Sequence, residues 1–243
     1  MELILLGHII GDFYLQTDEI VSKKGNVIKY MLLHCAIYSL IISVCFNFIY
    51  NNSGQTIHIF GIIFITHLVV DAVKQKISEK TKKYESMVFL IDQILHLLVL
   101  IIILFYINGS LKNLNIINET ICGVSLNKII VVICMMLICA KPSAIFITMI
   151  FKKISKFKEI PKKSKSEKEE AKIGRWIGIL EREIILILGL MGQYGAIGFV
   201  LTAKSLARFN QLNDQSFAEK YLVGTLLSSF LAIVCIAIYS VLY

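Results

Sequence analysis

Long apolar runs alternate with short polar links along the chain, and this alternation predicts the fold. A bilayer-spanning α-helix needs about 20 mostly apolar residues. Six runs meet this requirement, at 2–22, 30–50, 57–76, 86–107, 127–151 and 218–241. The sequence therefore predicts an all-α, polytopic transmembrane helix bundle with about six full spans.

A further apolar stretch at 175–210 is too long for one ordinary span. It is interrupted near its middle by Gly189, Gly192, Gln193 and Gly195. Because glycine destabilises a helix interior, we predict a short helical hairpin with helices at about 175–191 and 194–210. One long tilted helix is the alternative.

Composition supports a membrane protein. Of the 243 residues, 56% are hydrophobic and only 17% are charged, whereas a soluble domain has about 25% charged residues. The 2 prolines and 14 glycines are too few for a many-turned β-sandwich or a disordered polymer. These values exclude a soluble enzyme, a secreted disulfide scaffold and a disordered tail.

The net charge of +8 comes largely from the links between the apolar runs. Of the 25 Lys and Arg residues, 18 lie in the stretches 23–29, 74–83 and 152–175. Such links face the cytoplasm in multi-pass membrane proteins, so we predict that these three are cytoplasmic and that Met1 is outside. We expect 152–172 to be a solvated, partly disordered loop against anionic lipid headgroups. Nucleic acid is not an expected partner, because no aromatic residues interleave with these charges.

Ionisable residues inside the apolar runs are the candidate functional residues. They are costly to place in a bilayer and by default indicate function. Three predicted helices each carry a His/Asp pair spaced i,i+4, which places both side chains on one helix face. The pairs are His8 and Asp12, His67 and Asp71, and Asp92 and His96. We expect the three pairs to meet around one polar site.

Imidazole and carboxylate groups without thiolates suit Zn²⁺, Mn²⁺ or Fe²⁺, so the six paired residues are predicted metal ligands. One divalent cation would leave three ionised carboxylates at −1, and two cations with a hydroxide would leave no net charge. Gln16, His34 and Gln93 are predicted to bind substrate. The alternatives are a hydrogen-bond network of protonated Asp and neutral His, and a path for protons or ions.

A second polar group lies at the start of the predicted hairpin. Glu181 is about two turns inside it and is a candidate general base, with Asp92 as the other catalytic candidate. Arg175, Arg182 and Lys204 are predicted to bind an anionic headgroup or phosphate of the substrate. Alternatively, Glu181 pairs with Arg182 or Lys204 and locks the hairpin.

These motifs resemble a family of bacterial integral membrane proteins known only as a domain of unknown function. The resemblance rests on GHIIGDFYLQTD, HLVVDAVK and DQILHLL over about 1–107, and on GRWIGILERE with GQYGAIGFVLTAKSLARF over about 174–240. It implies a multi-pass protein of the bacterial cytoplasmic (inner) membrane and no established activity. HLVVDAVK is also similar to the SHxLxD-type helix of membrane-bound metal-dependent hydrolases. Only His67 and Asp71 match there, and the HRxxTHS-like motif of that group is absent.

The sequence thus favours a cytoplasm-facing intramembrane His/Asp site that binds a divalent metal, with hydrolysis of a lipid or lipid-linked substrate as the leading activity. Whether the protein is an enzyme stays open. The alternatives are a carrier for divalent cations or protons, and a structural membrane anchor for a cytoplasmic partner. Assembly into a homo-oligomer is compatible with each of these functions.

We divide the chain into four regions on this basis. They are an N-terminal four-helix membrane region with the His/Asp motifs (1–107), an outer loop with the fifth helix (108–151), the basic cytoplasmic loop (152–174) and the C-terminal membrane helices (175–243).

Overall fold

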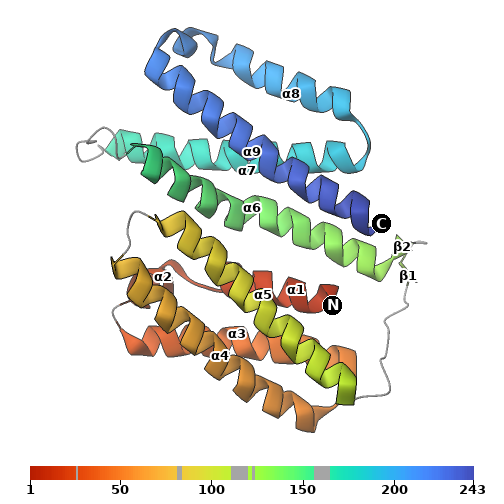
Figure 1. Cartoon of the computed structure of the whole chain (residues 1–243). Helices are drawn as coiled ribbons and strands as arrows, with labels where there is room; N and C mark the ends of the chain where they lie inside the picture. The colour runs from red at the N-terminus through yellow and green to blue at the C-terminus, as the bar shows by residue number, and fades with distance from the viewer. Residues whose placement is uncertain (26, 81–83, 111–119, 122–123, 156–164) are drawn as a thin grey trace. The chain divides into compact units, whose positions relative to one another are not determined.

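The computed structural model confirms the predicted all-α fold (Figure 1) and describes residues 1–25, 27–80, 84–110, 120–121, 124–155 and 165–243. Five of the described helices are long and apolar enough to span a membrane. These are α3 (Ile28–Tyr50), α4 (Ser53–Lys80), α5 (Glu85–Ser110), α6 (Leu126–Ser155) and α9 (Gln215–Leu242). They match five of the six predicted full spans, so the chain is a multi-pass membrane protein.

The first predicted span, 2–22, is not one helix. Helix α1 (Glu2–Ile9) continues into the π-helical turn η1 (Ile10–Tyr14), and a separate helix α2 (Asp18–Lys23) follows. The break arises because Thr17 is extended, with φ −69° and ψ 156°, and its side chain accepts a hydrogen bond from the Ile20 N–H at 3.3 Å. Thr followed by two acidic residues is an N-cap signal that the apolar pattern had concealed.

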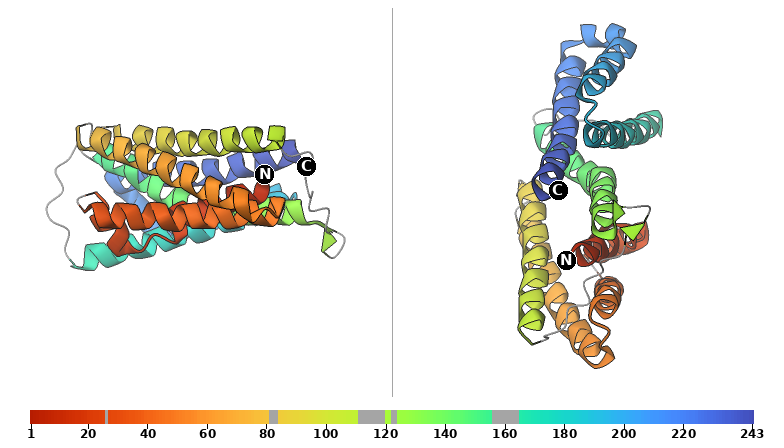
Figure 2. Two further views of the ribbon diagram at one scale, coloured as in Figure 1. Left: turned by 90° about the horizontal axis from the view of Figure 1, so that it is seen from below. Right: turned by 90° about the vertical axis from the view of Figure 1, so that its right-hand side faces the viewer.

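Helices α3, α4 and α5 pack in sequence, α3 against α4 and α4 against α5 (Figure 2). The link between the predicted spans 30–50 and 57–76 is only two residues long, because Asn51 takes the left-handed conformation (φ 48°) and α4 begins at Ser53. Asparagine tolerates this conformation better than most residues. The apolar core between these helices and α1 includes Ile4, Ile42, Phe46, Ile59, Ile63 and Ile103.

The predicted hairpin is confirmed, and the single long helix is excluded. Helix α7 (Lys165–Leu190) is followed by a turn with Gly192 at φ +71° and then by α8 (Tyr194–Ala207). A short 3-10 helix, η3 (Phe209–Asn213), leads into α9, which packs against α7.

The predicted basic loop at 152–172 is helical at both ends. Helix α6 reaches Ser155 and α7 begins at Lys165, ten residues before the predicted start at 175. Residues 165–172 are mostly Lys, Glu and Ala, which are strong helix formers, so the charged segment extends α7. The rest of that loop lies outside the described residues. In the predicted outer loop, β1 (Thr120–Ile121) pairs antiparallel with β2 (Val124–Ser125).

The chain divides into two compact units. The first covers Met1–Cys134 and the second Met135–Tyr243, so the boundary falls within α6. Each unit holds one of the two groups of polar residues singled out by the sequence.

Candidate metal centre

Two glycines bring the first candidate residues of the site against α3. A Cβ on Gly7 would lie 2.8 Å from Cys45 Sγ, and one on Gly11 would lie 3.1 Å from Tyr38 Cδ2. The glycines are four residues apart, a small-xxx-small spacing that lets membrane helices approach closely. This contact places the neighbouring side chains of His8 and Asp12 at the α3 surface. Asp12 lies in the π-helical turn, a feature frequent at functional sites.

Three further helices supply the other side chains. Most of them lie three or four positions from another on the same helix, and so share a helix face. Helix α3 contributes His34 and Tyr38, α4 contributes His67, Asp71 and Lys74, and α5 contributes Asp92, Gln93 and His96. We use the name His/Asp cluster for six buried residues of this group, Asp12, His34, His67, Asp71, Asp92 and His96.

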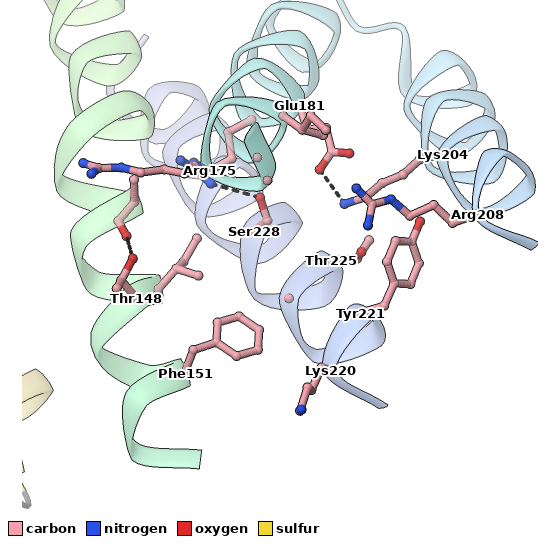
Figure 3. Close-up of a pocket in the computed structure, with 17 residues that line it drawn as sticks. Thr148, Phe151, Arg175, Glu181, Lys204, Arg208, Lys220, Tyr221, Thr225 and Ser228 are labelled. Atoms are coloured by element: carbon pink, nitrogen blue, oxygen red, sulfur yellow. Dashed lines mark hydrogen bonds and ion pairs between the residues drawn. The ribbon is translucent and has the colours of Figure 1, made fainter. Parts of the chain in front are cut away.

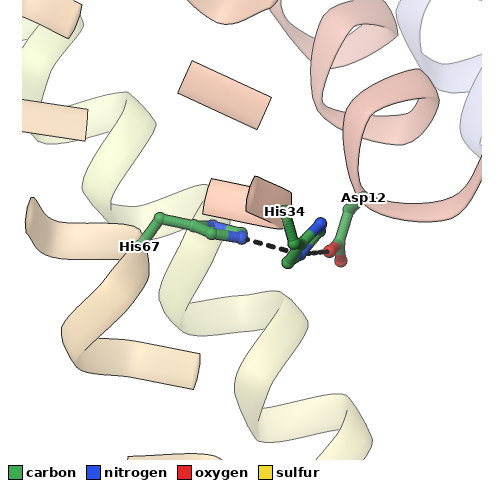
Figure 4. Close-up of side chains that lie close together, drawn as sticks. All are labelled: Asp12, His34 and His67. Atoms are coloured by element: carbon green, nitrogen blue, oxygen red, sulfur yellow. Dashed lines mark hydrogen bonds and ion pairs between the residues drawn. The ribbon is translucent and has the colours of Figure 1, made fainter. Parts of the chain in front are cut away.

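His34 lies between two other members of the cluster (Figure 4). Its Nε2 is 3.4 Å from Asp12 Oδ1 and 3.1 Å from His67 Nε2. The amide of Gln16 also contacts Asp12 Oδ1 at 3.2 Å and His34 Nε2 at 3.3 Å. The predicted substrate-binding residues Gln16 and His34 are therefore both packed against predicted metal ligands.

His8 is held by hydrogen bonds at both ring nitrogens. Its Nδ1 contacts Tyr38 Oη at 2.9 Å, and its Nε2 contacts Gln93 Oε1 at 3.2 Å. Gln93 in turn donates to Asp12 Oδ2 at 2.8 Å and to Asp92 Oδ2 at 3.1 Å. In this arrangement His8 orients Tyr38 and Gln93 and has no ring nitrogen left for an ion.

An aromatic stack fixes two of the cluster's imidazoles. The rings of Tyr38 and His67 are stacked with centroids 3.9 Å apart, and those of His67 and His96 with centroids 4.3 Å apart. Neither Tyr38 nor the stack was predicted, although Tyr38 is four residues after His34 and shares its helix face.

Several buried atoms of the cluster lack a hydrogen-bond partner among the described residues. They are Asp71 Oδ1, Asp92 Oδ1, His96 Nε2 and His67 Nδ1. Such atoms are rare, because nearly all buried polar groups in proteins are hydrogen-bonded. His96 Nε2 lies 3.4 Å from Asp92 Oδ1 and 3.8 Å from Asp71 Oδ1. Two tetrahedral ligands of one ion bound at about 2.1 Å are about 3.4 Å apart, so these separations fit a shared ion.

The cluster contains three groups of residues that could each hold a metal ion. Within each group the ligand atoms lie within 4.8 Å of one another. The groups are Asp12 with His34 and His67, His67 with Asp71 and His96, and Asp12 with Asp92 and His96. These buried His/Asp groups are thus compatible with a metal-binding site. His34 belongs to one of them, and His8 to none within the described part of the chain.

Two lysines complete the charge pattern and were not predicted to take part. Lys24 Nζ lies 3.3 Å from Asp71 Oδ2, and Lys74 Nζ lies 2.6 Å from Asp92 Oδ2. Lys74 is on the helix face of His67 and Asp71, so its spacing carried a signal that its place in a basic link obscured. Nothing in the spacing indicated Lys24, because its contact with Asp71 depends on the break in the helix before α2. Their side chains are 22% and 27% exposed, so they form the accessible edge of the cluster.

The predicted residues of the hairpin belong to the second unit. Lys204 Nζ is 2.6 Å from Glu181 Oε2, which is one of the two pairs expected to lock the hairpin. Arg182 is 2% exposed and donates to the carbonyl oxygens of Cys139 at 2.5 Å and Ala140 at 3.3 Å. Arg175 lines a pocket beside them. The candidate base Glu181 is therefore held by a lysine, and Arg182 by backbone carbonyls of α6.

Comparison with known proteins assigns the chain to a family but not to a function. No curated protein and no solved structure matches it. A family model described as a protein of unknown function (DUF3307) matches residues 1–125. This range contains the whole His/Asp cluster and both lysines. Because the match covers more than half of the 243 residues, the chain belongs to the DUF3307 family of proteins of unknown function.

Proposed function

We propose that the His/Asp cluster binds one divalent metal ion and hydrolyses an anionic lipid or lipid-linked substrate from the cytoplasmic side of a bacterial inner membrane. The observation that carries the proposal is the position of His96 Nε2, which lies 3.8 Å from Asp71 Oδ1 and 3.4 Å from Asp92 Oδ1. The three atoms are buried and lack hydrogen bonds within the described residues, and each oxygen lies at a ligand-to-ligand distance from the nitrogen. Nitrogen and oxygen donors without sulfur favour Zn²⁺, Mn²⁺ or Fe²⁺.

The charge of the centre favours one ion. The three carboxylates of the cluster and the ammonium groups of Lys24 and Lys74 sum to −1 with neutral histidines. One divalent cation with one hydroxide therefore brings the site to zero. A second cation would add charge that no further carboxylate of the cluster offsets, and uncompensated charge is costly in a low-dielectric interior.

The accessible edge of the cluster supports an anionic substrate. Lys24 and Lys74 are both partly exposed, and each ammonium can bind phosphate or carboxylate oxygens. Both belong to links whose positive charge favours the cytoplasmic side. An amphiphile in the inner leaflet would thus meet the two lysines first, with the cluster behind them.

A bound divalent ion would supply the nucleophile, because it lowers the pKa of its water to about 7. The protein's part is to hold the ligands and orient the substrate. The Tyr38–His67–His96 stack fixes the imidazoles, Gln93 fixes Asp12 and Asp92, and the lysines bind the anionic group.

Hydrolysis in detergent micelles tests the proposal. Purified full-length protein is incubated with phosphatidic acid or phosphatidylglycerol and Zn²⁺, Mn²⁺ or Fe²⁺, and released products are measured. Asp71→Asn keeps the shape of the ligand but removes its charge, so we expect metal-dependent release to fall at least tenfold. Glu219→Gln, an exposed carboxylate variant on α9, should retain it. Equal activity in Asp71→Asn and wild type, or equal activity with and without metal, would exclude catalysis by this centre.

A carrier of protons or cations is the second candidate. It is favoured by the unbroken line of contacts from His67 through His34 to Asp12, and from there through Gln93 to Asp92. Such chains of His and carboxylate groups carry protons in membrane transporters. In proteoliposomes a carrier would show ion flux that Asp71→Asn abolishes, with no substrate cleaved. Flux without hydrolysis would replace the first proposal by this one.

A further inference from the structure

A pocket in the second unit contains a second concentration of charge. It has a volume of about 320 Å³ and lies among α6, α7, α8 and α9 (Figure 3). Five cationic side chains line it, Arg175, Arg182, Lys204, Arg208 and Lys220, with a single carboxylate, Glu181. The pocket therefore has a strong positive potential.

Two of the five cations are engaged within the protein. Lys204 is ion-paired with Glu181, and Arg182 donates to the α6 carbonyls and to Ser228 Oγ at 3.2 Å. Pro142 has no N–H to donate to the carbonyl oxygen of Ile138. The hydroxyl of Ser143 donates to that oxygen instead, at 2.8 Å. Arg182 donates to the carbonyl oxygens of the next two residues, Cys139 and Ala140. Its role is thus to stabilise α6 around this proline and to form the pocket wall.

The other three cations have no ion-pair partner in the part of the chain that the structure describes. Arg175 and Lys220 are exposed, and Arg208 is half-buried. Arg208 Cζ lies 6.0 Å from the ring centroids of both Phe217 and Tyr221, which limits the directions in which its guanidinium can point. Three unneutralised cations around one pocket favour an anion with several oxygens, such as a phosphate group.

The pocket lies where apolar helix segments meet charged ones. The apolar part of α7 begins at Trp176, directly after Arg175, and α8 ends at Ala207 beside Arg208. Lys220 lies in the second turn of α9. A tryptophan with neighbouring basic residues is typical of the membrane–water interface, the depth at which lipid phosphates lie. Ile147, Phe151 and Ile177 give the same pocket apolar walls.

We propose that this pocket binds a phosphate-bearing ligand, with Arg175, Arg208 and Lys220 around the phosphate and the apolar walls of α6 and α7 against the attached chain. The site is separate from the His/Asp cluster and does not rest on the proposed hydrolysis. Its ligand is an anionic phospholipid headgroup or a soluble phosphate ester, which share the chemistry that the three cations recognise.

Ligand titration of the full-length protein in detergent tests the site. A fluorescent short-chain phosphatidylglycerol is the probe, and a phosphatidylcholine of the same chain length is the reference. The Arg208→Gln, Lys220→Gln double variant removes two of the three cations. The Lys29→Gln, Lys76→Gln double variant removes two exposed cations of the first unit and is the matched control for net charge.

We expect wild type and control to prefer phosphatidylglycerol by about tenfold, as charge-assisted contacts to phosphate favour, and the pocket variant to lose this preference. The same preference in all three proteins, or an equal loss in both variants, would overturn the proposal.

Competition by glycerol phosphate and inorganic phosphate then shows whether the ligand of the pocket is a lipid or a soluble phosphate ester. Displacement of the probe at millimolar concentration indicates a soluble phosphate ester, and its absence indicates a lipid. The Lys220→Gln single variant, changed only at an exposed position, should give an intermediate loss even if the double variant folds poorly.

Discussion

Asp71 shows how single atoms define the proposed metal site. One carboxylate oxygen, Oδ2, faces Lys24 at 3.3 Å and His34 Nε2 at 3.5 Å. The other, Oδ1, lies 3.8 Å from His96 Nε2 and has no hydrogen bond among the described residues. The lysine therefore neutralises one side of the carboxylate and leaves the other side for an ion. Asp92 is divided in the same way between Lys74 and His96.

Replacing Lys74 should therefore change metal binding and substrate binding in opposite directions. Lys74→Met lowers the charge of the empty centre by one unit, so a divalent cation should bind several-fold more tightly. An anionic substrate should bind less tightly, because half of the cationic edge is lost. Isothermal titration with Zn²⁺ and the KM for the phospholipid measure the two effects. Lys76→Met, an exposed position two residues on, is the control, and weaker Zn²⁺ binding by Lys74→Met would contradict the assignment of charges.

At the scale of the elements, the short first helix depends on its glycines. Helix α1 with η1 covers only residues 2–14, fewer than a full span requires. Its position against α3 rests on the close approach at Gly7 and Gly11. Because Asp12 follows directly after Gly11, the same contact sets the geometry of the His/Asp cluster.

A methyl group at Gly7 should therefore weaken both the fold and metal binding. The new Cβ would lie 2.8 Å from Cys45 Sγ, so α1 or the buried Cys45 side chain must shift, and overpacking of this kind costs roughly 1–3 kcal/mol. Gly61→Ala on α4 is the matched control, because a Cβ there meets nothing within 4 Å. We expect thermal unfolding in detergent to move to lower temperature, and bound metal to fall, only for Gly7→Ala. Equal behaviour of the two variants would show that the α1–α3 contact does not position the cluster.

Helix α6 depends on a side chain from α7 in a comparable way. Arg182→Met would leave the carbonyl oxygens of Cys139 and Ala140 without the donors they have now. Removing a donor from a buried acceptor costs about 1–3 kcal/mol for each group, so we expect a clearly lower unfolding temperature. Arg175→Gln, an exposed residue of the same helix, should leave stability nearly unchanged. An unaltered unfolding temperature in Arg182→Met would return Arg182 to the set of residues available for a ligand.

At the scale of the whole molecule, apolar length was enough to predict the five long helices that can span a membrane, but not the break within 2–22. Most boundaries fell within a few residues of those observed, because long apolar runs leave a membrane protein few alternatives. The i,i+4 spacing predicted which residues share a helix face, but not which faces meet. Lys24 contacts Asp71 because the helix breaks at Thr17. Arg182 is held within the protein because it donates to the carbonyl oxygens beside Pro142. Both are tertiary contacts that no local pattern contains.

The distribution of positive charge also predicts how the molecule is oriented. Ser53 and Ser78 lie near opposite ends of the spanning helix α4, and Ser78 is in a link predicted to be cytoplasmic. In a Cys122→Ser background, which removes the native cysteine of the predicted outer loop, a membrane-impermeant thiol reagent applied to intact bacteria should label Ser53→Cys and not Ser78→Cys. The reverse pattern would invert the topology and place Lys24 and Lys74 on the outer side.

The metal content of the purified protein tests the central claim most directly. Wild type, Asp71→Asn and Glu219→Gln are loaded with Zn²⁺ or Mn²⁺, freed of unbound metal, and measured by elemental mass spectrometry against protein concentration. The His/Asp cluster predicts about one ion per chain in wild type and Glu219→Gln, since the charge of the centre is balanced by one divalent cation with hydroxide, and almost none in Asp71→Asn. No bound ion in wild type, or the same content in all three proteins, would contradict a metal centre and leave the cluster as a hydrogen-bonded network between helices.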